Sequence, residues 1–276
     1  MKTERILHRP GGSNATPQSL AVAILTLLLV LIPGCRAQAP SSSGLPANEL
    51  TVSAAVSLKD AFRQIAEVYE KRTGTRIHFN YGASGALQKQ IESGAPVDLF
   101  ASAGAKQMDE LASKSLIVSD TRTDFARNSL VLITPARGIV IGSFIDLANP
   151  LVKKVAVGNP KTVPAGQYTE QTINKLKLLS QIQSKLIFAE DVRQVLDYVA
   201  RDEVDAGVVY SSDALSAGDK VKVVARAPDD SHDRILYPIA VVKDSQQKEA
   251  ARKFIDLVLS AEGQAILVKH GFLAIK

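Results

Sequence analysis

Two serines in this sequence lie where an extended apolar segment gives way to a helical pattern. Ser57 follows the segment Leu50 to Ala54, and Ser84 follows the segment Ile77 to Tyr81. The first turn of a helix exposes unpaired N–H groups at the positive end of the helix dipole, and a serine there adds a hydroxyl donor. Both junctions are therefore suited to hold an anion without a basic side chain.

Three later segments offer donors of the same kind. Val163-Pro164-Ala165-Gly166 and Ala189-Glu190-Asp191-Val192 each open a helical pattern, and Val208-Val209-Tyr210 ends an apolar strand with a phenol. All these donors are neutral, so aligned dipoles and hydrogen bonds would meet the charge of an oxyanion. We expect Pro164 to fix the backbone before Ala165, and Gly166 to leave space for an anion at the backbone.

Each of these residues, taken alone, also has an ordinary structural explanation. Ser57 and Ser84 could be helix N-caps, and Tyr210 could be a half-buried core aromatic. Ala165 and Val192 would act only through their backbone N–H groups, so their side chains carry no functional signal. Cap or solvated first-turn positions explain the charged residues nearby, which are Lys59, Asp60, Glu190 and Asp191.

Six motifs in order resemble those of the periplasmic molybdate-binding proteins of ABC-type uptake systems. They read TVSAAVSLKDAF, YGASGALQKQI, PVDLFASA, VPAGQYTEQ, AEDVRQVL and GVVYSSDA, and the resemblance spans roughly Leu50 to Lys276. The resemblance implies that a tetrahedral oxyanion, molybdate or tungstate, is the ligand. Its implied partners are the hydroxyls and amides of Ser57 and Ser84, the amides of Ala165 and Val192, and the Tyr210 hydroxyl.

The order of the elements predicts an α/β fold. Apolar alternation predicts strands near 50–54, 77–81, 97–101, 129–134, 154–157, 185–188, 206–210 and 235–242. Helical spacing predicts helices near 58–73, 84–91, 105–114, from 165 onward, 192–200, 246–259 and 261–269. This alternation indicates parallel sheets. The resemblance implies the two-lobed architecture of type II periplasmic binding proteins, each lobe a mostly parallel sheet flanked by helices.

The chain is expected to cross between two lobes near residues 126–131 and 233–240. We expect a signal peptide at 1–34, a flexible tether at 35–48, lobe 1 at 49–128 and 238–276, and lobe 2 at 129–237. The ligand cleft would lie between the lobes, beyond the carboxyl ends of strands.

The N-terminus predicts export. Lys2, Arg5 and Arg9 precede an apolar run from Leu20 to Ile32, which is too short for a confident membrane span. Cys35, the single cysteine, follows this run where a bacterial lipoprotein signal would be cleaved and the thiol lipidated. Pro33 departs from the usual lipobox, and the alternative is cleavage after Arg36-Ala37-Gln38-Ala39, which would discard Cys35.

The resemblance implies a solute-binding protein, not an enzyme, that delivers its anion to a membrane ABC permease. We expect a monomer in the periplasm or on the outer face of the cytoplasmic membrane, attached only by a lipid anchor. Removing residues 1–34 leaves 30 basic and 27 acidic residues, a balance too even and dispersed for nucleic-acid binding. No cofactor and no metal cation are expected, because the four histidines show no metal-ligand spacing and the sequence has no Walker A loop or GxGxxG motif.

Three alternatives remain open from the sequence. The same scaffold could bind another anion, such as sulfate or a small organic anion; it could be a sensory anion-binding module; and a hydrolase is a more distant possibility. An all-donor site would reject phosphate, because phosphate keeps a proton at neutral pH and needs an acceptor. Sulfate carries no such proton, so cavity size must separate it from molybdate.

Overall fold

The computed structural model describes residues 49–275. The predicted signal peptide, the tether and Cys35 lie outside these residues. Within residues 49–275, no helix combines the length and the apolar character needed to cross a bilayer.

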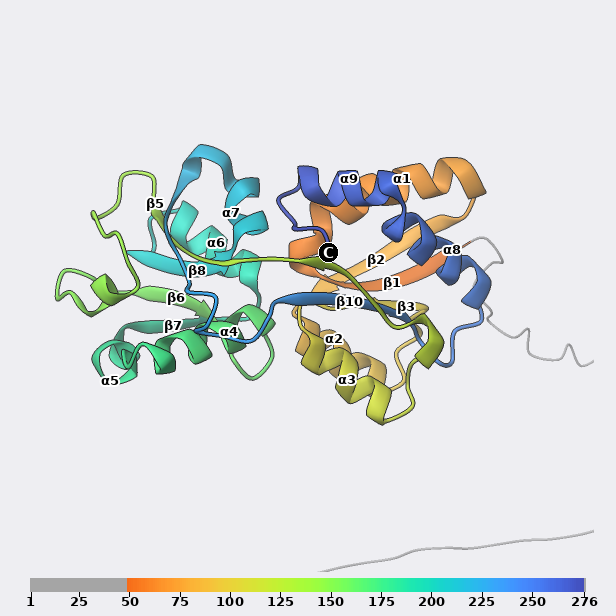
Figure 1. The fold of residues 1–276 in the computed structure, drawn as a ribbon, viewed down its shortest axis with the longest axis horizontal. Helices are drawn as coiled ribbons and strands as arrows, with labels where there is room; N and C mark the ends of the chain where they lie inside the picture. Colours follow the sequence, from red (N-terminus) through yellow and green to blue (C-terminus); the bar gives the residue numbers. More distant parts are fainter. Residues whose placement is uncertain (1–48, 276) are drawn as a thin grey trace, which may run out of the picture. The chain divides into compact units, whose positions relative to one another are not determined.

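The strands form two five-stranded sheets (Figure 1). Sheet 1 has the order β2-β1-β3-β10-β4, with β1 (Glu49–Ala55), β2 (Arg76–Gly82), β3 (Leu99–Ala101), β4 (Thr123–Arg127) and β10 (Leu236–Val241). Sheet 2 has the order β7-β6-β8-β5-β9, with β5 (Leu130–Pro135), β6 (Val155–Gly158), β7 (Leu186–Ala189), β8 (Ala206–Tyr210) and β9 (Val221–Arg226). The two-sheet α/β prediction is confirmed.

Both sheets are mixed, which corrects the prediction that they are mostly parallel. In sheet 1, β1 pairs in parallel with β2 and β3, while β10 pairs antiparallel with β3 and β4. In sheet 2, β6 pairs in parallel with β7 and β8, while β5 pairs antiparallel with β8 and β9. The reason is the crossing of the chain. Only Asn128 and Ser129 separate β4 from β5, so the chain passes directly from a strand of sheet 1 to a strand of sheet 2, and β5 runs antiparallel to β8 and β9 there.

Helices flank both sheets in Figure 1. Around sheet 1, helices α1, α8 and α9 pack on one another, as do α2 and α3. The helices around sheet 1 are α1 (Lys59–Thr73), α2 (Ser84–Glu92), α3 (Ala105–Ser113), α8 (Lys248–Leu259) and α9 (Ala261–Lys269). Those around sheet 2 are α4 (Pro164–Lys175), α5 (Leu179–Ile182), α6 (Val192–Ala200) and α7 (Ser211–Ala217).

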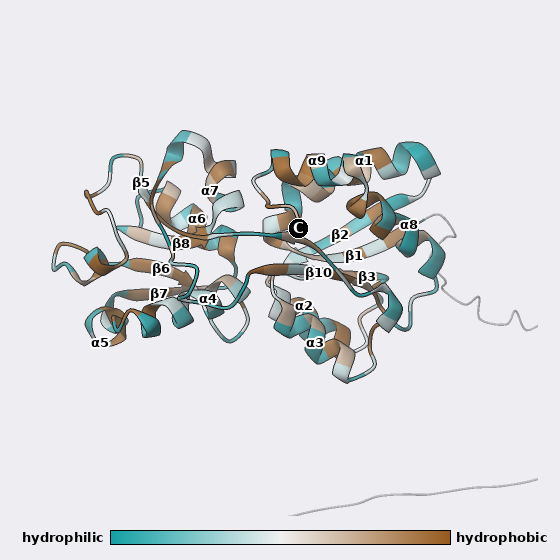
Figure 2. Cartoon of the chain, in the orientation of Figure 1, coloured by the Kyte–Doolittle hydropathy of each residue, from teal (hydrophilic) through white to brown (hydrophobic). Residues whose placement is uncertain are grey.

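Helix α1 illustrates how the sequence forms these elements. Its apolar residues recur at helical spacing and are buried, and the helix ends at Gly74, whose φ of 71° is the left-handed cap that glycine adopts readily. Phe62 on this face packs on Phe79, Phe125 and Phe254 in the core of sheet 1. Figure 2 shows that strands such as β6 and β10 are largely hydrophobic, whereas helix α8 carries both hydrophobic and hydrophilic residues.

Four elements were not predicted from the sequence: β4, α5, α7 and β9. Strand β4 has five residues, TDFAR, of which only Phe125 and Ala126 are buried, and β9 is an edge strand with exposed or half-exposed residues along most of its length. Short or half-exposed segments carry little periodicity, so the pattern did not reveal them. The lobe boundaries stay a prediction; the second one, between residues 237 and 238, falls inside β10.

Candidate anion-binding site

Ser57 lies in a short 3-10 turn, η1 (Val56–Leu58), between β1 and α1, and it makes no capping hydrogen bond. Its side chain is buried, and its Oγ lies 3.1 Å from the phenol oxygen of Tyr237 on β10. Asn128 Nδ2 donates to the same phenol oxygen over 3.3 Å. Because Tyr237 accepts from Asn128, it can donate its own proton to Ser57. That arrangement leaves the Ser57 proton for a ligand.

Ser84 is the first residue of α2, whose N-cap is Ala83, and again no side chain caps the helix. Ser84 is fully buried, and its Oγ accepts a hydrogen bond from the Ala103 N–H over 3.0 Å. This bond uses a lone pair, so the hydroxyl proton of Ser84 remains available to a ligand. The N-cap explanation therefore fails for both serines.

Tyr210 ends β8, and its side chain is buried with its hydroxyl turned toward sheet 1 elements. The hydroxyl donates to the carbonyl of Ala103 over 3.1 Å, so one peptide contacts both Ser84 and Tyr210. The Tyr210 ring packs against Tyr237 with a centroid separation of 5.7 Å. Burial, above all, raises the pKa of the Tyr210 phenol well above its usual value, so the phenol stays a neutral donor.

The starts of α2, α4 and α6 supply backbone donors. The first intrahelical bond of each ladder runs from Leu87 to Ala83, from Gln167 to Val163, and from Val195 to Asp191. The preceding N–H groups have no intrahelical acceptor. Gly85 donates instead to Thr162, and Gln194 donates to the Asp191 carboxylate. Within residues 49–275, the N–H groups of Ser84, Ala165 and Val192 make no hydrogen bond, and these are three of the predicted ligand groups.

Direct contacts join the start of α2 to the segment that precedes α4. The Gly85 N–H donates to the Thr162 carbonyl over 2.9 Å, and a Cβ at Gly85 would lie only 2.6 Å from that oxygen. Gln107 on α3 donates to Gln167 on α4 over 3.2 Å. The helix starts of the two sheets therefore meet at close range, and this close approach requires glycine at position 85.

Gly166 allows a close contact between α4 and β6. A Cβ at Gly166 would lie 2.1 Å from the Gly158 carbonyl oxygen at the end of β6. The missing side chain therefore lets α4 pack against β6, and the expectation that Gly166 also leaves room for an anion stays a prediction. Pro164 opens α4 at the first helical turn, where its missing N–H costs nothing.

One arginine lies beside these groups. Arg193 follows Val192 on α6; its Nε lies 2.6 Å from Asp213 Oδ1, and its Nη2 lies 2.8 Å from Asp60 Oδ2. Two carboxylates thus neutralise the guanidinium, and the three residues together carry a charge of −1 when both are ionised. Asp60 is an ion-pair partner, which corrects its expected role as a solvated first-turn residue. Asp191 caps α6 as expected.

The structure brings three of the five predicted residues into one network and places the other two at neighbouring helix starts. Ser84 and Tyr210 share the Ala103 peptide, and Ser57 joins Tyr210 through the Tyr237 ring. Val192 begins α6, which packs against η1, and Ala165 lies in the first turn of α4, beside the Gly85–Thr162 contact. Sequence reasoning missed four participants: Asn128, Arg193, Asp213 and Tyr237. Arg193 and Asp213 stand within the motifs AEDVRQVL and GVVYSSDA, which could have drawn attention to them.

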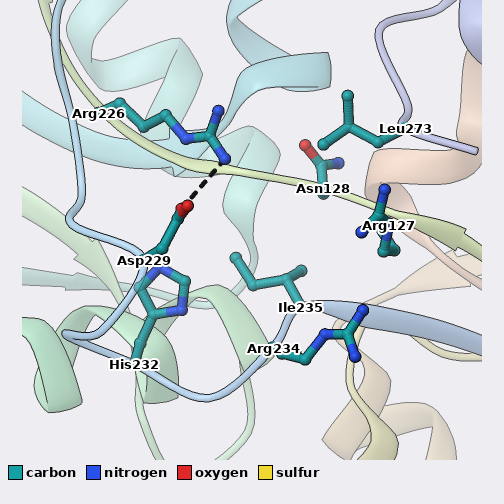
Figure 3. A pocket seen from close by; sticks show the side chains of 8 residues that line it. All are labelled: Arg127, Asn128, Arg226, Asp229, His232, Arg234, Ile235 and Leu273. Carbon is teal, nitrogen blue, oxygen red and sulfur yellow. Dashed lines mark hydrogen bonds and ion pairs between the residues drawn. The ribbon is translucent and has the colours of Figure 1, made fainter. Parts of the chain in front are cut away.

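A pocket of about 190 Å³ lies where the chain crosses between the two sheets, near residues 127–128 and 234–235 (Figure 3). It is lined by Arg127, Asn128, Arg226, Asp229, His232, Arg234, Ile235 and Leu273. Its basic side chains could attract an anion, and Arg226 pairs with Asp229 at 3.1 Å. None of the five predicted residues lines it, whereas Ser57, Asp60 and Arg193 line a smaller pocket of about 120 Å³.

Across residues 49–275, no cluster of three or more His, Cys, Asp or Glu side chains is placed to hold a metal ion. The donors at the helix starts are hydrogen-bond donors, which suit an anion and not a cation.

A family profile, that of the bacterial extracellular solute-binding proteins, matches residues 50–273 of this chain. The chain belongs to this family. Proteins of this family bind a solute. The predicted class of function, a solute-binding protein, is therefore confirmed, and the hydrolase alternative is set aside.

Two curated relatives of this solute-binding protein match it over most of its length. The Bacillus subtilis lipoprotein YvgL, provisionally named as an ABC transporter substrate-binding protein, is 40% identical over 258 residues, covering 93% of this chain and 98% of YvgL. The molybdate-binding protein ModA of Haemophilus influenzae is 39% identical over 233 residues, covering 82% of this chain and 90% of ModA.

A solved structure gives the same fold. The periplasmic molybdate-binding protein of Azotobacter vinelandii superposes with a TM-score of 0.74 at 24% identity, covering 82% of this chain and all of that chain. At this identity the likeness speaks for the fold of the solute-binding protein, which is that of the type II periplasmic binding proteins.

Asp213 gives the solute-binding protein a testable pH dependence. Burial raises the pKa of Asp213 to about 6, although Arg193 pulls it down. The folded state therefore binds this proton more tightly than the unfolded chain does, so the contribution of Asp213 to stability falls as the pH rises from about 4 to about 6. We expect the wild type to lose up to about 3 kcal/mol of unfolding free energy relative to Asp213→Asn between pH 4 and pH 7.

Urea denaturation of both proteins across this pH range measures the effect. Asp109→Asn, which changes a largely exposed carboxylate, is the control and should follow the wild-type pH curve. Parallel curves for the wild type and Asp213→Asn would contradict the raised pKa.

Proposed function

We propose that this solute-binding protein captures molybdate, and also tungstate, and delivers it to a membrane ABC permease. The observation that carries the proposal is the set of N–H groups of Ser84, Ala165 and Val192, which start three helices and have no acceptor within residues 49–275. Helix starts of this kind bind tetrahedral oxyanions. The ligands named for the Haemophilus and Azotobacter proteins support the choice of molybdate.

The charges around these groups favour a fully deprotonated anion. Arg193 already has two carboxylate partners, so the helix starts, two hydroxyls and the Tyr210 phenol would provide the attraction. The helix-start N–H groups and the two serine hydroxyls have protons free to donate, the Tyr210 phenol would donate once it releases the Ala103 carbonyl, and none of these groups needs to accept a proton from the ligand. Molybdate, tungstate and sulfate satisfy this requirement, while phosphate at neutral pH keeps a proton that such a shell leaves unmatched.

The remaining parts of the proposal concern organisation and location. We propose that residues 49–128 and 238–276 form lobe 1 and residues 129–237 form lobe 2, with the ligand held between them by Ser57, Ser84, Ala165, Val192 and Tyr210. The division of strands between the two sheets supports this arrangement. The protein would be a monomer, anchored through Cys35 to the outer face of the cytoplasmic membrane. The lipoprotein YvgL supports the anchor.

We expect molybdate to stabilise the folded protein and phosphate to leave it unchanged. A ligand specific to the folded state adds roughly 2.7 kcal/mol at 100 times its dissociation constant. Thermal melting and calorimetric titration of the purified protein with molybdate, tungstate, sulfate and phosphate would measure this effect. A phosphate shift equal to the molybdate shift would overturn the all-donor argument. Tighter binding of sulfate would move the assignment to that anion.

Substitutions at the predicted ligand residues separate hydroxyl from backbone contributions. Ser57→Ala and Ser84→Ala should each remove one charge-assisted hydrogen bond, which costs about 1.5–3 kcal/mol, or on the order of tenfold to a hundredfold in molybdate affinity. Val192→Ala should cost far less, because its amide remains. Val192→Pro removes the N–H at the first position of α6, where proline is tolerated, and the extended backbone of Asp191 suits a following proline.

Affinity and melting temperature of all four variants, measured together, test the assignment. Arg234→Ala, in the pocket at the chain crossings, is the control and should bind molybdate as the wild type does. If Arg234→Ala loses affinity while the serine variants keep it, the anion binds at the crossings and the five-residue assignment is wrong.

The lipid anchor has its own test. Cys35→Ser, expressed in a bacterium that processes lipoproteins, should move the protein from the membrane fraction to the soluble exported fraction, because the acylated thiol is the only proposed attachment. Fractionation and N-terminal analysis measure this. A wild-type protein that begins after Ala37 or Ala39 would refute the anchor.

A further inference from the structure

The ion pair between Asp60 and Arg193 joins the two halves of the molecule beside the candidate site. Asp60 lies in the first turn of α1, against sheet 1, and Arg193 lies in the first turn of α6, against sheet 2. Among the ion pairs of residues 49–275, it is the single one that links an element of sheet 1 to an element of sheet 2. Its position next to the predicted ligand groups therefore calls for an explanation.

Both partners are close in sequence to predicted ligand residues. Asp60 lies three residues after Ser57. Arg193 directly follows Val192, whose N–H makes no hydrogen bond within residues 49–275 and is a predicted ligand group. A contact between Asp60 and Arg193 therefore fixes the distance between η1 and the start of α6. Any movement that separates the two sheets must break this pair.

Asp213 forms a second ion pair with Arg193, through its Nε group. Its carboxylate is fully buried, one oxygen accepts from Arg193 Nε over 2.6 Å, and the other oxygen has no hydrogen-bond partner within residues 49–275. Because Asp213 and Arg193 both belong to elements packed on sheet 2, this half of the contact persists when the lobes separate. The Nη2 group of Arg193 would then stay oriented toward the place that Asp60 occupies in this structure.

We propose that Arg193, oriented by Asp213, is a closure latch that binds Asp60 when the lobes close over the anion. This inference rests on the proposed function, and it assigns Asp60 and Arg193 as positioning residues that raise affinity without touching the ligand. A contact made only in the closed form raises the closed fraction and hence the apparent affinity. Since it must break before the ligand leaves, its loss acts mainly on the dissociation rate.

Asp60→Asn is the sharpest test, because Asp60 is partly exposed and its replacement leaves the buried Arg193–Asp213 pair intact. We expect molybdate affinity to fall roughly threefold to tenfold through faster dissociation, with an unchanged melting temperature for the ligand-free protein. Asp60→Glu keeps the charge and should restore part of the affinity. Titration calorimetry and stopped-flow dissociation measure both constants.

Asp109→Asn is the matched control. Asp109 pairs with Arg122 at the same distance of 2.8 Å, but both residues belong to the half of the molecule built on sheet 1. The control should keep wild-type affinity. Unchanged affinity in Asp60→Asn, or an equal loss in Asp109→Asn, would overturn the latch. Wild-type protein that binds no molybdate would instead refute the proposed function, so the two failures are distinct.

Discussion

The constraint on which this structure depends is that helix starts from two different sheets must meet with their N–H groups open. Among the described residues, helices α2, α4 and α6 leave N–H groups of their first turns without an acceptor, including those of Ser84, Ala165 and Val192. Such groups are costly when buried unless an anion or another acceptor satisfies them. The close contact of Gly85 with Thr162 shows how little space separates two of these helix starts. The surrounding fold serves to hold these donors in place.

The charge distribution follows from this constraint. A free arginine beside the helix starts would bind many anions by its charge alone, including phosphate. Here Arg193 has two carboxylate partners, so the attraction for a ligand depends on oriented neutral dipoles. Tyr237 and Asn128 extend the same principle, because their hydrogen bonds allow Tyr237 to donate to Ser57 and so leave the Ser57 proton for a ligand. Selectivity can then rest on the protonation and the size of the ligand.

The mixed sheets explain how one chain builds two facing sets of helix starts. Strands β4 and β5 run on from sheet 1 to sheet 2 through Asn128 and Ser129, and β10 returns to sheet 1 between β3 and β4. The side chain of Asn128 links this crossing to Tyr237 and Ser212. The connection between the sheets is therefore also a part of the hydrogen-bond network around Ser57, which ties the crossings to the site.

The sequence by itself determined the local elements and the family. The spacing of apolar residues predicted α6, α9 and β8 to the residue, and the order of six motifs pointed to solute binding. Local patterns can do this because period and capping are properties of neighbouring residues. The sequence did not predict β4 or β9, the mixed pairing of the sheets, the close packing of Gly166 on β6, or the partnership of Asp60 with Arg193. Only the tertiary structure decided these, because each depends on contacts between residues far apart in the chain, and Asp60 and Arg193 are 133 positions apart.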